Sequence, residues 1–398
     1  MPVGTPFHER TFALCESLSY REWSGYYTVS AYETHHEHEY NAIRSAAALI
    51  DISPLFKYVI TGRDASRLVD RVMTRDVSRM EPGRVFYTPW CDERGKVIDD
   101  GTVARLDEQR FRWTAADPTL RWLHQNASGL DVTIDDVSER VAALALQGPL
   151  SAQVLRAAGA DIDRLRYFHV TSTRVGGIDV DVSRTGYTGD LGYEVWMPAG
   201  RALDIWDALM HAGAPFAVKP AGMLALDVAR VEAGLLLMDV DFHGARKAMT
   251  ALQQYTPYEM GLGRLVDLKK AAFVGRDALV AAAASPPPRM VVGLEIDWDD
   301  VERLHERTGL VPVAPAAASR VAVPVMRGRH QIGRATTTAW SPALKRLIAL
   351  ATLDAPHYAP GTRVDFEVTV DARRLTASAT VARTPFFDPA RKTACPAQ

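Results

Sequence analysis

A strand, a glycine-rich loop and a second strand dominate the middle of this 398-residue chain. The stretch reads Arg184-Thr-Gly-Tyr-Thr-Gly-Asp-Leu-Gly-Tyr-Glu194, and its three glycines disfavour a helix or a long strand because glycine loses backbone entropy in both. Residues 178–183 and 193–197 alternate like half-buried strands. The stretch therefore predicts a tight turn that brings a carboxylate and two phenols close to a bound group, or a plain hairpin whose glycines only supply positive φ.

The composition is that of an ordinary globular protein, with 47% hydrophobic residues, 24% charged residues and a net charge of −2. A charge so near zero argues against nucleic-acid and anionic-membrane partners. No apolar run approaches the ~18 residues that cross a bilayer, and the N-terminus lacks the apolar core of a secretory signal. Cys15, Cys91 and Cys395 have no paired spacing, which favours reduced thiols in a cytoplasm.

Strand-like and helix-like segments with hairpins alternate irregularly in the first part of the chain, so we expect α+β architecture. A stiff linker, Ser285-Pro-Pro-Pro-Arg289, separates the predicted regions 1–284 and 290–398. The second region is rich in strand signals and poor in helix signals, which predicts a β-barrel or sandwich. Residues 33–49 read as one helix whose histidines, at 35, 36 and 38, lack the H-E-x-x-H spacing, and we predict no metal site.

Two further stretches contain residue types suited to a binding site. Residues 23–32 hold Tyr26, Tyr27 and Tyr32 around a glycine, where core packing is the default interpretation and an aromatic pocket is the alternative. Asp99 and Asp100 are adjacent in a predicted strand, although aspartate is disfavoured there. Their side chains must point to opposite faces, and periodicity alone does not say which one faces inward.

The glycine-rich stretch closely resembles R-T-G-Y-T-G-x-x-G-[YF]-E, the signature of the folate-binding T-protein of the glycine cleavage system. The same superfamily includes folate-dependent demethylases. Residues 95–100 are similar to the G-G-x-I-D-D of T-proteins, and further matches at 144–149, 220–233, 273–279 and 341–344 are collinear with that family. The resemblance implies tetrahydrofolate as the cofactor and three subdomains arranged like a cloverleaf around a central folate channel, the last a C-terminal β-barrel.

The resemblance also implies individual roles. Asp100 matches the aspartate that approaches the reactive edge of tetrahydrofolate, where a carboxylate stabilises positive charge on the attacking nitrogen and relays its proton. Glu194 matches the glutamate that holds the pterin, since one carboxylate accepts two parallel N–H donors. Tyr87 and Tyr187 match aromatic residues of the folate site. Arg184 either faces the anionic tail of the folate or orders the loop.

Several positions depart from the T-protein pattern. Pro54 stands where T-proteins have a histidine, and Leu226 stands where they have an arginine. Leu235 and Met238 replace aromatic residues, and Arg264 replaces a tryptophan found in some relatives. These changes suggest a one-carbon donor other than the lipoyl-bound aminomethyl group.

On this interpretation the residues that contact the donor would be Arg264, Tyr27 and Tyr32. Tyr26 is the candidate proton donor for the leaving group.

Three functions follow from the resemblance. The leading hypothesis is a demethylase that moves a methyl group from a small O-, N- or S-methyl compound to N5 of tetrahydrofolate. The second is the aminomethyltransferase of glycine cleavage, which requires a lipoyl carrier protein as partner. The third is a non-catalytic folate-binding factor for iron–sulfur assembly, against which stands the absence of that group's K-G-C-Y-x-G-Q motif near residues 273–276.

Overall fold

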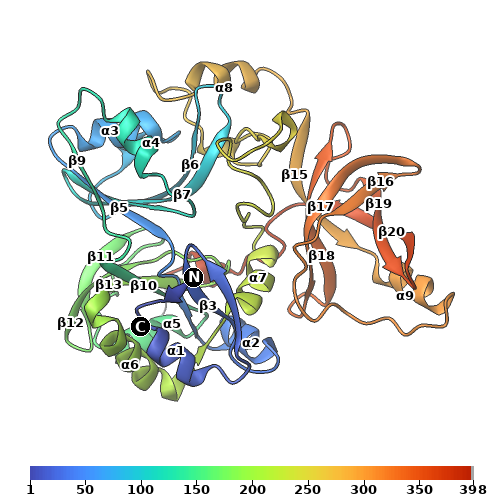
Figure 1. Cartoon of the computed structure of the whole chain (residues 1–398), viewed down its shortest axis with the longest axis horizontal. Helices are drawn as coiled ribbons and strands as arrows, with labels where there is room; N and C mark the ends of the chain where they lie inside the picture. Colours follow the sequence, from blue (N-terminus) through green and yellow to red (C-terminus); the bar gives the residue numbers. More distant parts are fainter. Residues whose placement is uncertain (396–398) are drawn as a thin grey trace.

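The computed structural model describes residues 1–395, so the last three residues of the predicted region 290–398 lie outside the described residues. The chain forms three lobes, two of mixed helix and sheet and one β-barrel (Figure 1). This confirms the predicted α+β class with a C-terminal barrel. Both mixed lobes are discontinuous in sequence, because the chain leaves the first lobe near residue 52, builds most of the second, and returns near residue 141.

The first lobe is built on a six-stranded sheet of order β11-β12-β13-β10-β4-β14. The central strand β10 is a nearly continuous apolar run, as a strand covered on both faces should be. The helices α5 and α6 cover one face of the sheet around Trp206, and α2 and α7 cover the other. The elements are β4 (Ala48–Asp51), β10 (Val141–Gln147), β11 (Val170–Val175), β12 (Ile178–Ser183), β13 (Gly192–Pro198), β14 (Lys219–Pro220), α2 (Glu37–Ser45), α5 (Ser151–Ala157), α6 (Ala202–Gly213) and α7 (Met223–Glu232).

A small three-stranded sheet of order β1-β3-β2 completes this lobe beside α1. Its elements are β1 (Val3–Gly4), α1 (His8–Leu14), β2 (Ser19–Trp23) and β3 (Tyr26–Ala31). The single helix predicted over residues 33–49 is wrong in its extent. The helix ends at Ser45, because Ala48–Asp51 forms a fully buried strand that pairs with both β10 and β14.

The second lobe contains a five-stranded antiparallel sheet of order β6-β7-β8-β5-β9. Helix α3 buries Leu68, Val69 and Val72 completely, and these apolar side chains meet the Trp90–Trp113 pair on the inner sheet face. The elements are β5 (Phe56–Thr61), α3 (Ala65–Val72), β6 (Val85–Cys91), β7 (Val97–Asp107), β8 (Arg110–Ala115), α4 (Leu120–Asn126), β9 (Thr133–Asp136) and α8 (Arg276–Ala283).

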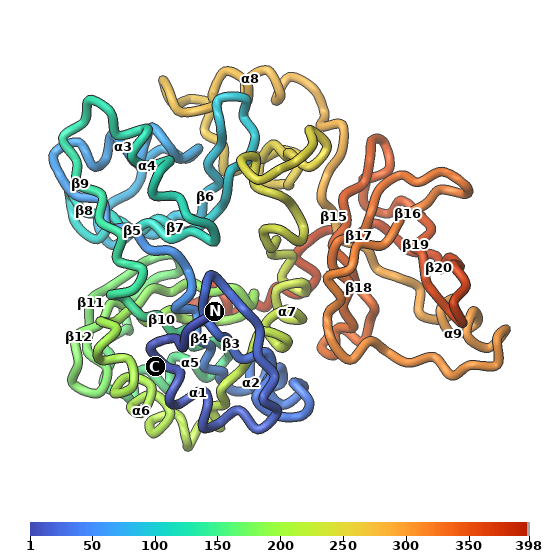
Figure 2. Tube along the Cα trace, in the orientation of Figure 1, coloured from blue at the N-terminus to red at the C-terminus, as the bar shows by residue number. Residues whose placement is uncertain are grey.

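The third lobe is a closed six-stranded barrel of order β15-β18-β17-β16-β19-β20. It contains one helix, α9, which the sequence did not predict and which follows the first strand directly. The tube in Figure 2 shows the segment after the barrel returning from this lobe to the first one. The elements are β15 (Arg289–Ile296), α9 (Trp298–Glu306), β16 (Val323–Arg327), β17 (His330–Ser341), β18 (Arg346–Asp354), β19 (Arg363–Val370) and β20 (Arg373–Ala382). No helix among residues 1–395 is long and apolar enough to span a bilayer.

Candidate functional site

The register of β6 and β7 decides which of the two adjacent aspartates faces inward. Tyr87 lies opposite Thr102, two residues beyond Asp100, so Tyr87 and Asp100 share one face of the sheet. The Tyr87 hydroxyl donates a hydrogen bond of 2.6 Å to Asp100 Oδ2. Asp99 points to the other face, is completely buried, and accepts hydrogen bonds from the backbone N–H groups of Asp100 and Asp117. Asp99 therefore orders the backbone, and Asp100 is the aspartate available for chemistry.

Glu194 lies on β13, opposite Ser183 of β12. Thr185 Oγ1 donates a hydrogen bond of 2.7 Å to Glu194 Oε2, and Ser183 lies at 3.5 Å from the same oxygen. The other oxygen, Oε1, receives no hydrogen bond from any side chain or backbone group of residues 1–395. One edge of this carboxylate is therefore fixed, and the other is available to a ligand.

Arg112 brings the two acid-bearing faces together. Its guanidinium forms a 2.7 Å ion pair with Asp181 of β12 and lies 4.5 Å from the ring of Trp196 on β13. Trp196 is two residues from Glu194 and so shares its face. In the second lobe, Arg112 and Thr114 lie on the same face of β8, and the Thr114 hydroxyl is hydrogen-bonded to that of Thr102 on β7. Thr102 is two residues from Asp100, so Arg112 and Asp100 share this sheet face. The faces that carry Glu194 and Asp100 therefore look toward each other.

A buried glutamine explains two glycines of the central loop. A Cβ at Gly186 or at Gly192 would lie 2.1 or 2.2 Å from Gln147 Oε1. Gln147 needs this space because its amide donates to the carbonyls of Thr185 and Tyr193 and accepts from Thr188. The glycines thus let one side chain hold both ends of the loop, which presents Tyr187 between them. The Tyr187 hydroxyl donates to the carbonyl of Leu236 after α7.

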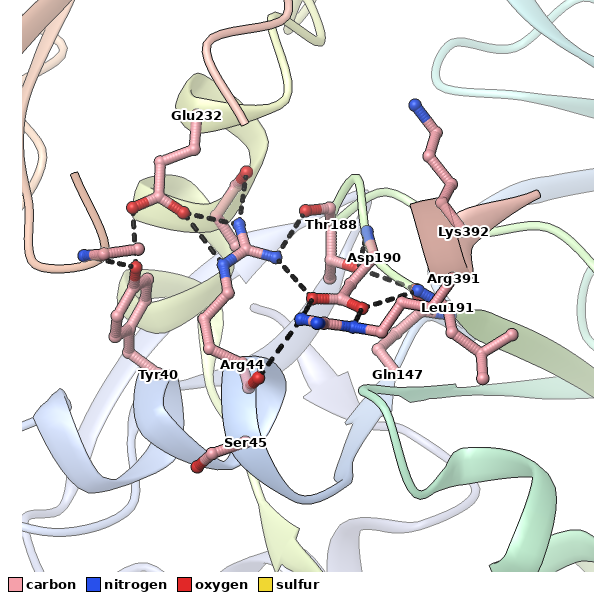
Figure 3. Close-up of polar contacts among 12 residues, drawn as sticks. Tyr40, Arg44, Ser45, Gln147, Thr188, Asp190, Leu191, Glu232, Arg391 and Lys392 are labelled. Atoms are coloured by element: carbon pink, nitrogen blue, oxygen red, sulfur yellow. Dashed lines mark hydrogen bonds and ion pairs between the residues drawn. The ribbon is translucent and has the colours of Figure 1, made fainter. Parts of the chain in front are cut away.

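A second set of contacts holds the loop from outside, where helices and the C-terminal segment meet it (Figure 3). Arg44 on α2 donates to the carbonyl of Thr188 at 2.9 Å and pairs with Glu232 of α7 at 2.5 Å. Arg391 forms two hydrogen bonds to the buried carboxylate of Asp190, at 2.6 and 2.7 Å. Residues from the first lobe and from the segment beyond the barrel therefore fix the loop jointly.

The four facing residues are half-buried, and we call Tyr87, Asp100, Tyr187 and Glu194 together the recess. Tyr87, Asp100, Tyr187 and Glu194 each keep some exposed surface, yet burial is the largest cause of the raised pKa of all four. Burial raises the pKa of Asp100 to about 6, against the hydrogen bond from Tyr87, which lowers it. Burial likewise raises the pKa of Glu194, and Thr185, Arg112 and Ser183 oppose this rise. Perturbed carboxyl groups of this kind gather at functional sites.

Two arginines predicted for the site lie at its margins. Arg264 is exposed in the short 3-10 helix η5 (Gly263–Leu265), close enough for its charge to lower the pKa of Tyr87. Arg184 is 1% exposed, and its Nη2 donates to the carbonyls of Lys392 and Ala394. Of the two alternatives for Arg184, the contacts favour ordering of the loop against the C-terminal segment.

The three tyrosines of the N-terminal stretch have other neighbours within residues 1–395. Tyr32 is 3% exposed in a small core cluster with Cys15 and Val29, so its side chain has the default role of core packing. Tyr27 is exposed and contacts the rings of His8 and Tyr20.

Tyr26 is half-buried, and burial, followed by the charges of Glu139, Asp51 and Asp136, raises its pKa. No hydrogen bond within residues 1–395 joins any of these three tyrosine side chains to Asp100 or Glu194.

Sequence reasoning missed several residues that build the site. Arg112 lies inside β8, but this strand also contains Arg110 and Thr114, so residue type alone does not mark Arg112 as a site residue. Gln147 ends a buried apolar strand, which marks it as a polar group that needs partners. The role of Arg391 had no local signal, because its partner Asp190 is 201 residues away. Among the described residues no cluster of three or more metal-ligating side chains occurs.

Two family models match the chain. The model described as the GCVT N-terminal domain matches residues 7–270, and the glycine cleavage T-protein C-terminal barrel domain matches residues 289–388. The chain is 34% identical to an aminomethyltransferase of Streptomyces avermitilis, over 97% of this chain and 99% of that protein. It is 33% identical to the trimethylamine-oxide aldolase of Ruegeria pomeroyi over 98% of this chain, but spans only 47% of that relative.

A solved structure shows the same fold. Aminomethyltransferase T of the Bartonella henselae glycine cleavage system superposes with a TM-score of 0.83 at 23% identity, over 98% of this chain and 99% of that one. The glycine-rich loop lies within the residues that match the N-terminal model, and the closed barrel lies within those that match the C-terminal barrel model. The protein therefore belongs to the glycine cleavage T-protein family, whose matched members are enzymes.

Proposed function

We propose that this chain is a tetrahydrofolate-dependent one-carbon transferase. The observation that carries the proposal is a pair of carboxylates on facing sheets, one with an unbonded oxygen and one with a pKa raised to about 6. The other observations supply the surroundings: Tyr87 and Tyr187 beside the acids, and Arg112 to favour the charged form of Glu194. The proposed partner is a small one-carbon donor, and the proposed compartment is the cytoplasm.

Glu194 fits the edge of a reduced pterin. Such a ring presents two parallel N–H donors, and a carboxylate accepts both at once in the bidentate geometry of charge-assisted pairs. Thr185 and Ser183 hold Oε2 from behind, so the carboxylate is oriented before a ligand arrives. When bound, tetrahydrofolate supplies N5 as the nucleophile that accepts the one-carbon group.

Asp100 is the group proposed to act on the reacting nitrogen. With a pKa of about 6 it is mostly ionised at neutral pH, so it stabilises positive charge nearby or takes a proton. In a methyl transfer one methyl–heteroatom bond breaks and one methyl–nitrogen bond forms. The leaving atom keeps the electron pair and receives the proton lost from N5, and we propose that Asp100 relays it.

We propose a methylated small molecule as the donor. Leu226 is half-buried at the margin of one core cluster, and Met238 is buried in another, so apolar groups occupy positions where the T-protein pattern has an arginine and an aromatic residue. Apolar side chains at these two positions suit a methyl-bearing donor better than an aminomethyl group on a carrier arm. The similarity to a relative named trimethylamine-oxide aldolase agrees with a donor of this kind.

The aminomethyltransferase of glycine cleavage is the second candidate. The specific observation in its favour is the relative of that name in Streptomyces avermitilis, which the chain matches over 99% of its length. This function would need a lipoyl carrier protein as partner. The third hypothesis, a folate-binding factor for iron–sulfur assembly, receives no support from the relatives described above, which are named as enzymes.

A donor screen separates the two enzymatic candidates. Purified protein with tetrahydrofolate is offered trimethylamine N-oxide, N-methyl amino acids and S-methyl compounds, and separately an aminomethylated lipoyl carrier. Mass spectrometry then distinguishes 5-methyltetrahydrofolate from methylenetetrahydrofolate. We expect 5-methyltetrahydrofolate from one methylated donor, formed about 100-fold more slowly or worse by the Asp100→Asn variant. Methylenetetrahydrofolate with ammonia from the carrier would replace the demethylase by the aminomethyltransferase.

A further inference from the structure

Three arginines gather at β6, the edge strand that carries Tyr87. The guanidinium of Arg75 stacks on the Phe86 ring, with Cζ 3.6 Å from the ring centroid, and that of Arg84 lies 5.9 Å from the same centroid. The Phe86 ring packs in the same core as Trp90, so it lies on the sheet face opposite Tyr87 and Asp100. Arg75 Nη1 also donates to the carbonyl of Tyr87 at 3.2 Å, so Arg75 reaches the Tyr87–Asp100 pair at the edge of the sheet.

The third arginine reaches the group from another part of the chain. Arg264 belongs to η5, and the hydroxyl of Thr74 donates to the carbonyl of Leu265 at 2.8 Å. The backbone N–H of Asp267 donates in turn to the carbonyl of Thr74. These two bonds fix the η5 segment alongside the residue that precedes Arg75. Each of the other two guanidiniums lowers the pKa of Arg75, which agrees with this closeness.

No carboxylate neutralises these charges. Within residues 1–395 none of the three arginines forms an ion pair, whereas the buried Arg44, Arg112 and Arg230 all do. Their hydrogen bonds go to neutral acceptors: the Tyr87 carbonyl for Arg75, the His169 ring for Arg84, and the Gly261 carbonyl for Arg264. The His169 ring lies 3.3 Å from Arg84 Nη1, and burial lowers the pKa of His169, which keeps the ring neutral.

Such an arrangement is unfavourable without a counter-ion. Burial and the neighbouring guanidiniums together lower the pKa of Arg75 to about 10. Like charges repel most strongly where the surroundings are partly desolvated. A guanidinium group forms paired hydrogen bonds with a carboxylate and stacks on aromatic rings. Arg75 already stacks on Phe86, and we infer that its remaining N–H groups suit a planar anion.

We propose that Arg75, Arg84 and Arg264 form a binding site for a carboxylate-bearing ligand at the edge of the Tyr87–Asp100 site. This inference rests on the proposed function, because it assigns the charged end of a molecule that reacts there. Two sources supply the same chemistry: the glutamyl carboxylates of tetrahydrofolate, and a carboxylate on the one-carbon donor. Leu226 occupies the position of the arginine expected to contact the ligand, so the three arginines would take over the recognition of negative charge.

The test uses Arg75→Gln and Arg264→Gln in the full chain, with Arg63→Gln as the matched control. Arg63 lies in the same lobe with a side chain 75% exposed, and its substitution removes the same charge away from the cluster. Titration calorimetry measures the Kd of tetrahydrofolate and of 6,7-dimethyltetrahydropterin, which keeps the ring and lacks every carboxylate. Steady-state kinetics compare dimethylglycine with trimethylamine N-oxide. Glutarate-dependent thermal stabilisation provides a readout without any pterin.

We expect each cluster variant to weaken tetrahydrofolate binding about 10-fold or more and to leave the Kd of the pterin fragment unchanged. This result would identify the glutamyl tail as the ligand of the arginine site. A KM for dimethylglycine raised about 10-fold, with folate binding unchanged, identifies the donor instead. Either result, with Arg63→Gln like the native protein, supports the site. Unchanged folate binding, unchanged KM and unchanged glutarate stabilisation in both variants would overturn it.

The inference and the proposed function fail in different ways. If the native protein binds no tetrahydrofolate, the proposed function is refuted. Stabilisation by glutarate that disappears in Arg75→Gln would still support the anion site. Should a variant fold poorly, the glutarate response of the native protein, measured against chloride at equal ionic strength, decides the question alone, and its absence overturns the site.

Discussion

Two groups of buried charges in this protein differ in how completely their atoms are bonded. In the network of Figure 3, Glu232 Oε1 accepts from Tyr40, while Oε2 accepts from Arg44. Ser341 also donates to Oε1. Both oxygens of Asp190 are bonded as well. In the recess, by contrast, Glu194 leaves one oxygen free, and three arginines beside Asp100 have no carboxylate partner within residues 1–395.

This difference separates the residues that hold the fold together from the residues that are available to a ligand. A fully satisfied polar network fixes one arrangement, because breaking any member leaves an uncompensated buried charge. The network ties α2, α7 and the C-terminal segment to the loop that carries Tyr187. Groups in the recess keep exposed surface and unfilled bonding capacity, which is what a ligand needs. Substitutions in the network should therefore change stability, and substitutions in the recess should change binding and turnover.

The largest expected effect is the loss of stability caused by a substitution of Glu232. Replacing it with glutamine leaves the buried Arg44 with Asp190 at 3.5 Å as its remaining ion pair, and breaking one side of a buried pair costs about 3–5 kcal/mol. Glu194→Gln is the matched change in the recess and should alter the free energy of unfolding by less than about 1 kcal/mol, since its side chain remains partly exposed. Urea denaturation measures both. Equal losses in the two variants would erase the distinction.

The next effect concerns turnover. Asp100→Asn should lower kcat about 100-fold or more, because a positioned acid–base group contributes roughly that much, while the Kd of tetrahydrofolate changes little. The adjacent Asp99→Asn is the control within the same strand. Its carboxylate bonds two backbone N–H groups, so that variant should lose about 1–3 kcal/mol of stability. Turnover that survives Asp100→Asn would show that Asp100 is not catalytic.

These two aspartates also mark the limit of what the sequence could predict. Strand alternation placed them on opposite faces, and the resemblance selected Asp100, but only the register of β6 and β7 shows that Tyr87 shares its face. Most strands, the helix Leu120–Asn126 and the barrel followed from apolar periodicity, since that pattern is local.

Contacts between distant segments were the part that could not be predicted. Arg112 meets Asp181 and Trp196 from another sheet, and Arg264 joins Arg75 and Arg84 from a distant segment. A chain read locally contains no information on which lobes face each other. For the same reason Tyr26, Tyr27 and Tyr32 could be grouped with the site by residue type, although no hydrogen bond connects their side chains to its acids.

An intermediate effect is expected where the network reaches the C-terminal segment. Arg391→Ala leaves the buried Asp190 with Arg44 at 3.5 Å as its remaining ion pair. Because Arg391 is itself 40% exposed, the loss should be about 2 kcal/mol, less than for Glu232. The folate Kd should rise a few-fold as the loop loosens. Lys392→Ala, which breaks only an exposed pair with Asp388, should leave both quantities unchanged, and a similar loss there would remove the specific role of Arg391.

The smallest effect is a shift in pH dependence and concerns the bond between Tyr87 and Asp100. Turnover that needs the Asp100 carboxylate should fall as the pH drops through about 6, the pKa at which that group becomes protonated. Tyr87 donates to the charged form and so lowers this pKa. Tyr87→Phe removes the donor, the pKa rises, and the acid limb of kcat should move up by about one unit.

Tyr187→Phe is the control for this shift, because its hydroxyl donates to the Leu236 carbonyl and not to the aspartate. Its acid limb should stay where the native limb is, even if folate binds more weakly. A limb that moves equally in both variants would mean that loss of a phenol changes the solvation of the recess. If the acid limb moves in neither variant, a group other than Asp100 controls the fall in turnover at low pH. Asp100 would then not be the catalytic base.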